Sequence, residues 1–226
     1  ANSVLKPKRP PSPFYRVNSL MKAELLDVMG NDLTVVNTAR VSMGKWKDEF
    51  DERDMNLIRY LADHGHWSPF SHPKAQFRIT APIFVARQWE RHRVGCVRGY
   101  DLYDHNELSR RYVDDDPEFF RPVTWRSRPD GSIKQGSGKS LDESDQKDAR
   151  YFYETAVDTC KDSYTRLLRL GVAPEQARMV LPQSMYTSWI ETGSLMYWAR
   201  LCRQRIDAHA QAEICDLSKQ VDSVMY

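Results

Sequence analysis

The chain has 226 residues and a formal net charge of +2, from 33 basic and 31 acidic residues. With 41% hydrophobic residues it can bury one sizeable core, and the near balance of charge excludes the strong positive field that holds many proteins on nucleic acid. Four cysteines lie far apart with no Cys-x-x-Cys pair, which argues against a disulfide framework and favours a reducing cytoplasm.

The first fifteen residues, rich in lysine and proline, are expected to form a loose arm ahead of one domain over residues 16–226. They lack the apolar centre of a signal peptide, and no apolar run approaches the roughly 18 residues of a membrane span. The apolar stretch Leu20–Val28 predicts a strand that leads into a Gly30-Asn31 turn, and a helix is expected from about Leu33.

Apolar residues recur at helical spacing behind an acidic first turn between Asp51 and His64, which predicts an amphipathic helix ended by Gly65. Alternation over Gln76–Thr80 predicts a half-buried strand. Pro82 suits a helix start, so a helix is expected over Ile83–Arg93. This part of the chain therefore predicts a strand that runs directly into a helix.

The second half of the chain is predicted to be mainly helical. Asp130–Asp148 is rich in Gly, Ser, Lys and Asp without periodicity and is expected to be a long loop. A long helix with Phe152–Leu167 follows and ends at Gly171, Pro174 begins another that carries Arg178, and Ser194–Val224 is mostly helix. With strands early and helices late, the predicted fold class is α+β, a single domain whose mainly antiparallel sheet is flanked by helices.

Three local patterns have simpler explanations than the sites they suggest. Gly136–Ser140 resembles the end of a P-loop, but the first glycine and the preceding strand are absent, so an ordinary loop is expected. Three histidines within His64–His72 have no fourth ligand at a recognised spacing, so no metal site is predicted. Cys96 follows two arginines and could be an activated nucleophile, but a small filler residue is the favoured interpretation.

Two basic clusters remain, Arg91-His92-Arg93 and the segment from Asn106 to Tyr112. Placing so many guanidinium groups beside apolar segments costs folding free energy unless an anionic ligand lies among them. Arg178 likewise interrupts an apolar helix. The planar forks of these arginines suit phosphate and pyrimidine edges alike, which predicts a nucleotide site.

These residues resemble a known family. Arg91-His92-Arg93 followed by Glu107-x-Ser109-x-Arg111-Tyr112 is similar to the Arg-His-Arg, seven residues, Ser signature of flavin-dependent thymidylate synthases. The similarity extends from about residue 20 to 215 through further segments, namely Asp27–Asp32, Thr38–Ser42, Gly65–Phe70, Ala81–Trp89, Ala177–Pro182 and Asp207–Ile214. Membership of this family is therefore expected.

The resemblance implies a role for each matching residue. Residues that would contact the flavin are Ser68, Arg91, His92, Arg93, Glu107, Glu191, Gly193, Tyr197 and His209. Residues that would contact deoxyuridylate (dUMP) are Gln88, Arg91, Glu107, Leu108, Ser109, Arg110, Arg111, Arg178 and Arg205. Arg205 would be catalytic, because a guanidinium beside N3 and O4 of uracil stabilises an anion there and makes C5 nucleophilic.

The reaction that the resemblance implies is reductive methylation of dUMP to dTMP. FAD would be the bound cofactor, NADPH the reductant and 5,10-methylenetetrahydrofolate the methylene donor. Homotetramers whose sites draw on several subunits are expected as well. Nucleotide and folate would be the only partners, without membrane or nucleic acid.

The chain also departs from the family pattern. Fifteen residues separate Arg93 from Ser109 where the family has seven, which indicates an insertion at about Val97–Asp104. Glu191-Thr192-Gly193 stands where the family has Asn-x-Arg, and Tyr197 replaces a second Asn. One alternative is therefore C5 hydroxymethylation, or action on another pyrimidine nucleotide such as dCMP. A second, of another class, is a non-catalytic nucleic-acid-binding protein, whose binding would weaken steeply with salt.

Overall fold

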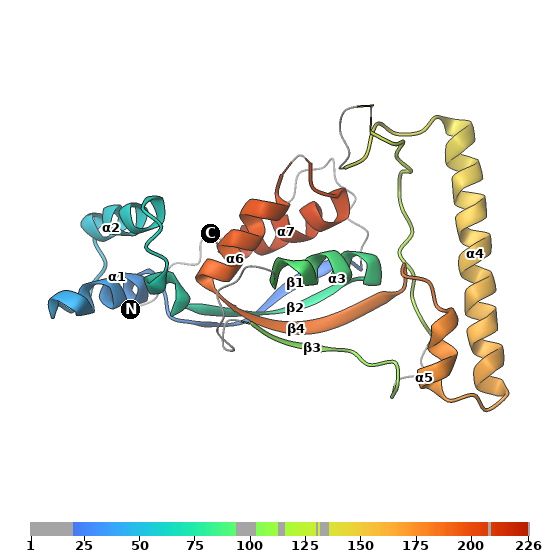
Figure 1. The fold of residues 1–226 in the computed structure, drawn as a ribbon, viewed down its shortest axis with the longest axis horizontal. Coiled ribbons are helices and arrows are strands. Elements are labelled where there is room, and N and C mark those ends of the chain that lie inside the picture. Colours follow the sequence, from blue (N-terminus) through green and yellow to red (C-terminus); the bar gives the residue numbers. More distant parts are fainter. Residues whose placement is uncertain are drawn as a thin grey trace.

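The computed structural model describes residues 20–93, 103–112, 116–129, 131, 136–207 and 209–225. The predicted N-terminal arm, Cys96 and most of the predicted insertion lie outside these residues. Within the described ranges, none of the helices combines the length and apolar character that crossing a membrane requires. Figure 1 shows an elongated arrangement, with a sheet at the centre, two short helices at one end and a long helix at the other.

The sheet has four antiparallel strands in the order β1-β2-β4-β3. Their bounds are Lys22–Met29 for β1, Lys74–Pro82 for β2, Tyr103–Glu107 for β3 and Tyr186–Ser194 for β4. The predicted α+β fold with an antiparallel sheet is thus confirmed for the described residues. Strand β4 is central and was not predicted, because its pairing partners β2 and β3 lie far from it in the sequence.

Alternation along β2 and β4 gives the sheet one buried face and one open face. Phe77, Ile79 and Trp189 belong to the main core, which lies on the buried face. Three helices cover this face in Figure 1: α3 (Ile83–Glu90), α6 (Leu195–Arg205) and α7 (Ala212–Met225). Helix α3 continues into a 3-10 turn, η3 (Arg91–Arg93), so the predicted helix over Ile83–Arg93 is confirmed with a tighter last turn.

Two capped helices stand at one end of the molecule. Helix α1 (Asp32–Arg40) begins after Asn31 and α2 (Glu52–Asp63) after Asp51, and both cap residues form capping boxes. The start of α1 and both ends of α2 lie within two residues of their predictions. Short 3-10 turns follow them, η1 (Val41–Met43) and η2 (Ser68–Ser71).

At the opposite end stands the long helix α4 (Glu143–Arg169), with α5 (Pro174–Ala177) and the 3-10 turn η4 (Arg178–Val180) packed against its C-terminal half in Figure 1. The predicted loop over Asp130–Asp148 was too long, because Asp142 caps α4 by accepting a hydrogen bond from the Asp145 amide. Arg178 lies in η4 rather than within the predicted helix. The last third is interrupted between α6 and α7, so it is not one continuous helix.

Candidate functional site at the β3 edge

Two pairs of the residues predicted to bind nucleotide are brought together in the structure, Gln88 with Arg205 and Glu107 with Arg178. Register pairs His105 with Glu191 and Glu107 with Trp189, and paired residues of antiparallel strands point to the same face. Glu191 and Trp189 are buried under the helices. Strand β3 therefore directs His105 and Glu107 toward α3 and α6.

Arg205 and Gln88 form the centre of this site, although they lie 117 residues apart. The Arg205 guanidinium donates from Nη2 to the Gln88 carbonyl oxygen at 3.1 Å. Its Nε and the side-chain Oε1 of Gln88 are buried polar atoms without a hydrogen-bond partner. Such atoms are rare in proteins, and a ligand with both donors and acceptors would satisfy both. Burial also lowers the pKa of Arg205, but a guanidinium keeps its charge.

His92 lies beside this pair and is nearly inaccessible, at 2% exposure. Its Nδ1 is 3.1 Å from Oε1 of Gln204, and its Nε2 is 3.3 Å from the Tyr197 carbonyl oxygen. Burial, together with the charges of Arg205 and Arg200, lowers the pKa of His92 despite these contacts. The neutral imidazole is therefore favoured, and it braces α6 against the end of α3.

Glu107 marks the outer side of the site. Its Oε1 accepts a hydrogen bond from the Thr187 hydroxyl at 2.7 Å, and its Oε2 lies 4.0 Å from Nε2 of His105. His105, Thr187 and the charge of Arg178 together hold the pKa of Glu107 below its usual value, although burial opposes them. Glu107 and Arg178 are thus brought close enough to interact, and the carboxylate is ionised at neutral pH.

The residues after Glu107 form a tight turn. Leu108 is exposed, and Arg110 is buried at 7% exposure. Arg111 donates from Nε to the Ser109 hydroxyl at 3.2 Å, and its guanidinium lies 5.1 Å from the centre of the Tyr112 ring. The turn therefore presents one exposed apolar side chain and one exposed guanidinium from a fixed backbone.

Glu191 lies on the inner side of the site and is completely buried. The indole Nε1 atoms of Trp89 and Trp189 donate to its Oε2 at 2.9 and 2.7 Å, and the Tyr197 hydroxyl donates to its Oε1. Burial raises the pKa of Glu191, while these donors and the nearby His105 counteract the shift. A carboxyl group with three donors is well satisfied, and it ties α3, β4 and α6 together.

Gly193 belongs to the same buried region. A Cβ atom there would lie 2.4 Å from Cδ1 of Tyr197 and 3.1 Å from the indole nitrogen of Trp198. The described contacts of Glu191, Gly193 and Tyr197 are thus all inside the protomer. Their contact with flavin stays a prediction, and so do the flavin roles of Ser68, Arg91 and His209, which are exposed and have no described contact with the Arg205 pair. The side chain of Arg93 lies outside the described part of the chain.

Comparisons with known proteins agree with the motifs. The family model described as "Thymidylate synthase complementing protein" matches residues 24–225. The flavin-dependent thymidylate synthase of Thermosipho africanus is 41% identical over 200 residues, covering 88% of this chain and 83% of the relative. That of Kosmotoga olearia is 42% identical over 193 residues, covering 84% and 78%.

The chain belongs to the flavin-dependent thymidylate synthase family. Solved structures agree with this membership. A UMP/dUMP methylase, PolB from Streptomyces cacaoi, bound with 5-Br dUMP, has a TM-score of 0.75 at 31% identity and covers 90% of this chain and 88% of its own. The same enzyme bound with 5-Br UMP has a TM-score of 0.73 at 28% identity, covering 90% and 87%. The fold and the flavin dependence of the family are thereby established for this chain.

His105 is the site residue that analysis of the sequence missed in this family member. It immediately precedes the Asn106-Glu107 motif, and that proximity was the available signal. Its ring nitrogen, a carboxylate oxygen of Glu90 and one of Glu107 lie within 4.8 Å of one another. This is the separation of a set of metal ligands, but both carboxylates are partly exposed and pair with the imidazole. Ion pairing explains the group without a metal.

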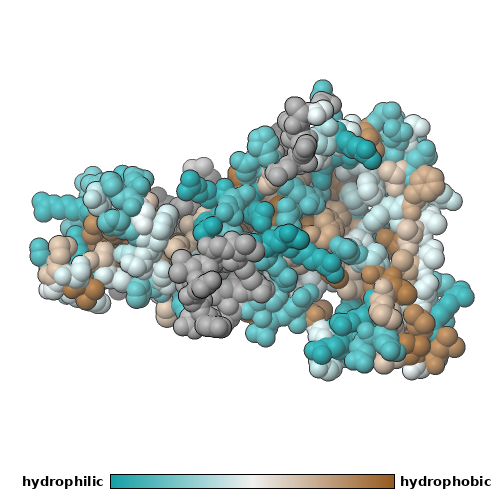
Figure 2. Space-filling model, in the orientation of Figure 1, coloured by the Kyte–Doolittle hydropathy of each residue, from teal (hydrophilic) through white to brown (hydrophobic). Residues whose placement is uncertain are grey.

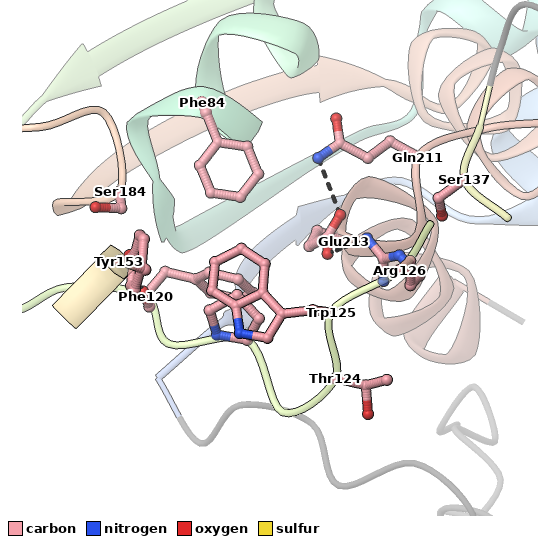
Figure 3. Close-up of a pocket in the computed structure, with 11 residues that line it drawn as sticks. Phe84, Phe120, Thr124, Trp125, Arg126, Ser137, Tyr153, Ser184, Gln211 and Glu213 are labelled. Carbon is pink, nitrogen blue, oxygen red and sulfur yellow. Dashed lines mark hydrogen bonds and ion pairs between the residues drawn. The ribbon is translucent and has the colours of Figure 1, made fainter. Parts of the chain in front are cut away.

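A separate cavity of about 320 Å³ lies between α3, α4 and the start of α7 (Figure 3). Aromatic side chains dominate its wall, among them Phe84, Phe120 and Trp125, and the ion pair of Arg126 with Glu213, at 2.5 Å, closes one side. None of the predicted flavin or nucleotide residues lines it. The cavity is therefore distinct from the β3-edge site.

Proposed function

We propose that this family member methylates dUMP to dTMP, with FAD as cofactor, 5,10-methylenetetrahydrofolate as methylene donor and NADPH as reductant. The observation that carries the proposal is the joining of Gln88 and Arg205, each with a buried polar atom that has no hydrogen-bond partner. A uracil ring offers donors and acceptors along one edge, which fits this pair.

In this proposal Arg205 is the catalytic residue. Its charge lies beside N3 and O4 of the uracil and stabilises negative charge there, so that C5 becomes nucleophilic without covalent attack by the protein. The cationic residues Arg91, Arg111 and Arg178 bind the phosphate, because a planar guanidinium suits phosphate oxygens. The turn residues Leu108, Ser109 and Arg110 hold the nucleotide from the other side.

Flavin binding in this proposal relies on Arg91, His92 and Arg93 at the end of α3, with Ser68, Glu107 and His209 nearby. Because the neutral state of His92 is favoured, its role in this proposal is to orient neighbouring groups rather than to supply a charge. The flavin, reduced by NADPH, supplies the hydride that completes the methyl group. The proposal also includes a homotetramer whose sites are shared between copies of the chain. Ser68 and His209 are exposed, and in this proposal a second copy completes the site around them.

The test is a reconstituted assay. Purified protein loaded with FAD should show flavin absorbance and convert dUMP to dTMP, detected by mass spectrometry, only when NADPH and 5,10-methylenetetrahydrofolate are both present. Protein that retains no flavin and forms no dTMP would contradict the proposal. If such a flavin-free protein bound nucleic acid, and its affinity decreased steeply with salt concentration, the non-catalytic alternative would be supported.

UMP is a second candidate substrate. The observation that favours it is the similarity to PolB, which is named a UMP/dUMP methylase and was solved with both brominated nucleotides. Competition between dUMP and UMP in one reaction measures the preference directly. Adding dCMP to the same reaction tests the cytidylate alternative. Mass spectrometry of the products, which would detect an extra oxygen atom, tests the hydroxymethylation alternative.

A further inference from the structure

His105 is surrounded by carboxyl groups from three elements. Its Nε2 lies 3.7 Å from Oε1 of Glu90 at the end of α3 and 4.0 Å from Oε2 of Glu107 on its own strand. Buried Glu191, its register partner on β4, acts on it electrostatically. These distances are those of ion pairs rather than of hydrogen bonds, so the attraction depends on the charge of the imidazole.

Packing fixes the position of this ring. The His105 ring lies against the indole of Trp189, with centres 5.8 Å apart and planes 31° apart, and its side chain is only 12% exposed. Trp189 in turn donates to Glu191. The imidazole therefore packs against the same buried network that joins β4 to α3 and α6. Its position is more restricted than that of a histidine on the surface.

Glu107 needs such a support. It is the last residue of an edge strand, its side chain is 41% exposed, and Thr187 contacts only one of its two oxygens. Proximity to His105 is the largest influence that holds the pKa of Glu107 below its usual value. The other oxygen thus relies on the imidazole and on the more distant charge of Arg178.

We propose that His105 is a positioning residue, whose imidazole, packed against Trp189, holds the Glu107 carboxylate in the orientation that nucleotide binding requires. The inference rests on the proposed role of Glu107 at the dUMP site. Removal of the imidazole should therefore weaken dUMP binding through Glu107.

The experiment measures dUMP binding to the FAD-loaded enzyme by calorimetry for His105→Gln, Glu107→Gln and the double variant. His105→Gln should raise the Kd about fivefold in the wild-type background and change it less than about twofold in the Glu107→Gln background, because residues that act through one contact are not additive. His105→Phe, which keeps the aromatic ring, should weaken binding as His105→Gln does. Glu143→Gln, an exposed carboxyl group on α4, is the matched control and should leave the Kd unchanged.

Each outcome decides the proposal. Equal effects of His105→Gln in both backgrounds would overturn it. Full rescue by His105→Phe would show that the ring acts only through packing, and would overturn it too. Loss of dUMP affinity on removal of divalent metal would replace it with a metal site at Glu90, His105 and Glu107. Wild-type enzyme that binds no dUMP at all would refute the proposed function itself, and the urea midpoints of the same variants would then show whether His105 and Glu107 are coupled in the fold.

Discussion

The last turn of α6 and the backbone of α3 position Arg205. Among the described contacts, no acidic side chain pairs with it. Its hydrogen bond to a carbonyl oxygen fixes the guanidinium without neutralising it. The full positive charge is thus available to a ligand. This is the arrangement that electrostatic catalysis requires, because a paired carboxylate would cancel much of the field.

Replacement of Arg205 by alanine should lower kcat by about 100-fold or more, because a preorganised charge at the reacting ring is lost. Flavin retention, measured by absorbance after gel filtration, should decrease far less. Arg203→Ala on the exposed side of the same helix is the control and should keep both properties. Equal loss of turnover and flavin would show that Arg205 binds the cofactor instead.

Gly193 makes a residue-scale prediction about stability. An alanine Cβ would collide with the ring of Tyr197, which is itself locked by its hydrogen bond to Glu191, so the ring cannot move away cheaply. Gly193→Ala should lower the free energy of unfolding by about 2–3 kcal/mol in urea titrations. Gly131→Ala, where no atom lies within 4 Å of the new Cβ, should be neutral or slightly stabilising. Similar midpoints for the two variants would contradict this account.

The arginine clusters and the Glu107 turn were predictable from sequence because charge beside apolar segments is costly and therefore informative. The buried contacts of Glu191 and Tyr197 were not, since a carboxyl group in the core is recognisable only when its donors are known. Trp89 lies 102 residues from Glu191, and spacing along the chain carries no sign of such a pair. His105 did have a signal in the sequence, its place directly before Asn106-Glu107, but its contact with Glu90 joins two distant elements.

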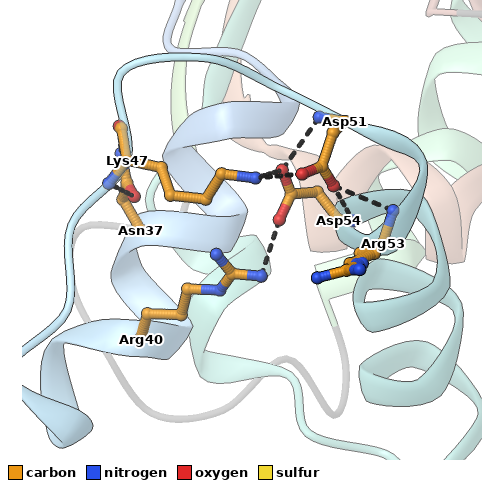
Figure 4. Close-up of polar contacts among 6 residues, drawn as sticks. All are labelled: Asn37, Arg40, Lys47, Asp51, Arg53 and Asp54. Carbon is orange, nitrogen blue, oxygen red and sulfur yellow. Dashed lines mark hydrogen bonds and ion pairs between the residues drawn. The ribbon is translucent and has the colours of Figure 1, made fainter.

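At the scale of elements, α1 and α2 are joined by a charged cluster (Figure 4). Asp54 is completely buried and lies 2.6 Å from Nζ of Lys47 and 2.7 Å from Nη2 of Arg40. Burial alone would raise the pKa of Asp54, but Lys47, the Asp51 amide and Arg40 more than offset it and leave the pKa below its usual value. Asn37 completes the joint by exchanging two hydrogen bonds with the backbone of Lys47.

Because the pKa of Asp54 is lowered on folding, its stabilisation is present above the ordinary carboxyl range and is lost as pH falls through the folded value. Asp54→Asn should therefore lower the free energy of unfolding at neutral pH by about 3 kcal/mol, since two cations lose their buried partner. Urea titrations should show the difference from wild type shrinking toward acidic pH. Exposed Asp48→Asn is the control, and a difference that persists at low pH would refute the assignment to charge.

Elements with amphipathic periodicity, such as α2, were predicted almost to the residue. Strand β4 was missed because it follows loop-like residues and is flanked by helices, and because its pairing partners β2 and β3 are distant in sequence. The start of α4 was missed for a different reason, since its first turn is polar and exposed and gives no periodic signal. Pairing between strands sets the position of β4, and the Asp142 cap sets the start of α4. Neither produces a pattern of hydrophobic residues in the sequence.

At the scale of the whole molecule, α4 stands away from the sheet and carries exposed aromatic residues. Tyr151 and Phe152 are 66% and 69% exposed, and Leu170 and Met179 near the other end are 80% and 78% exposed. Figure 2 shows hydrophobic atoms along this end of the molecule, around α4 and α5. Single exposed apolar residues are common, but a long helix with several of them suits contact with another copy of the chain.

The expected assembly is a homotetramer, with a mass in solution about four times the 26.4 kDa of the chain. Phe152→Glu should reduce that mass in sedimentation experiments, because a charge would be buried at the contact. Lys147→Ala on the same helix is the control. A monomeric wild-type protein with full activity would contradict both the assembly and the sharing of sites.

Among the described strands, the sheet order places β3 at an edge, paired with β4 alone. A change of length in the chain before an edge strand leaves the pairing of the other three strands untouched, and lengthening a loop costs little free energy. A chimera that takes the chain before β3 from a relative should therefore keep the other three strands in place. Competition between dUMP and UMP in such a folded chimera would measure whether that part of the chain affects substrate preference.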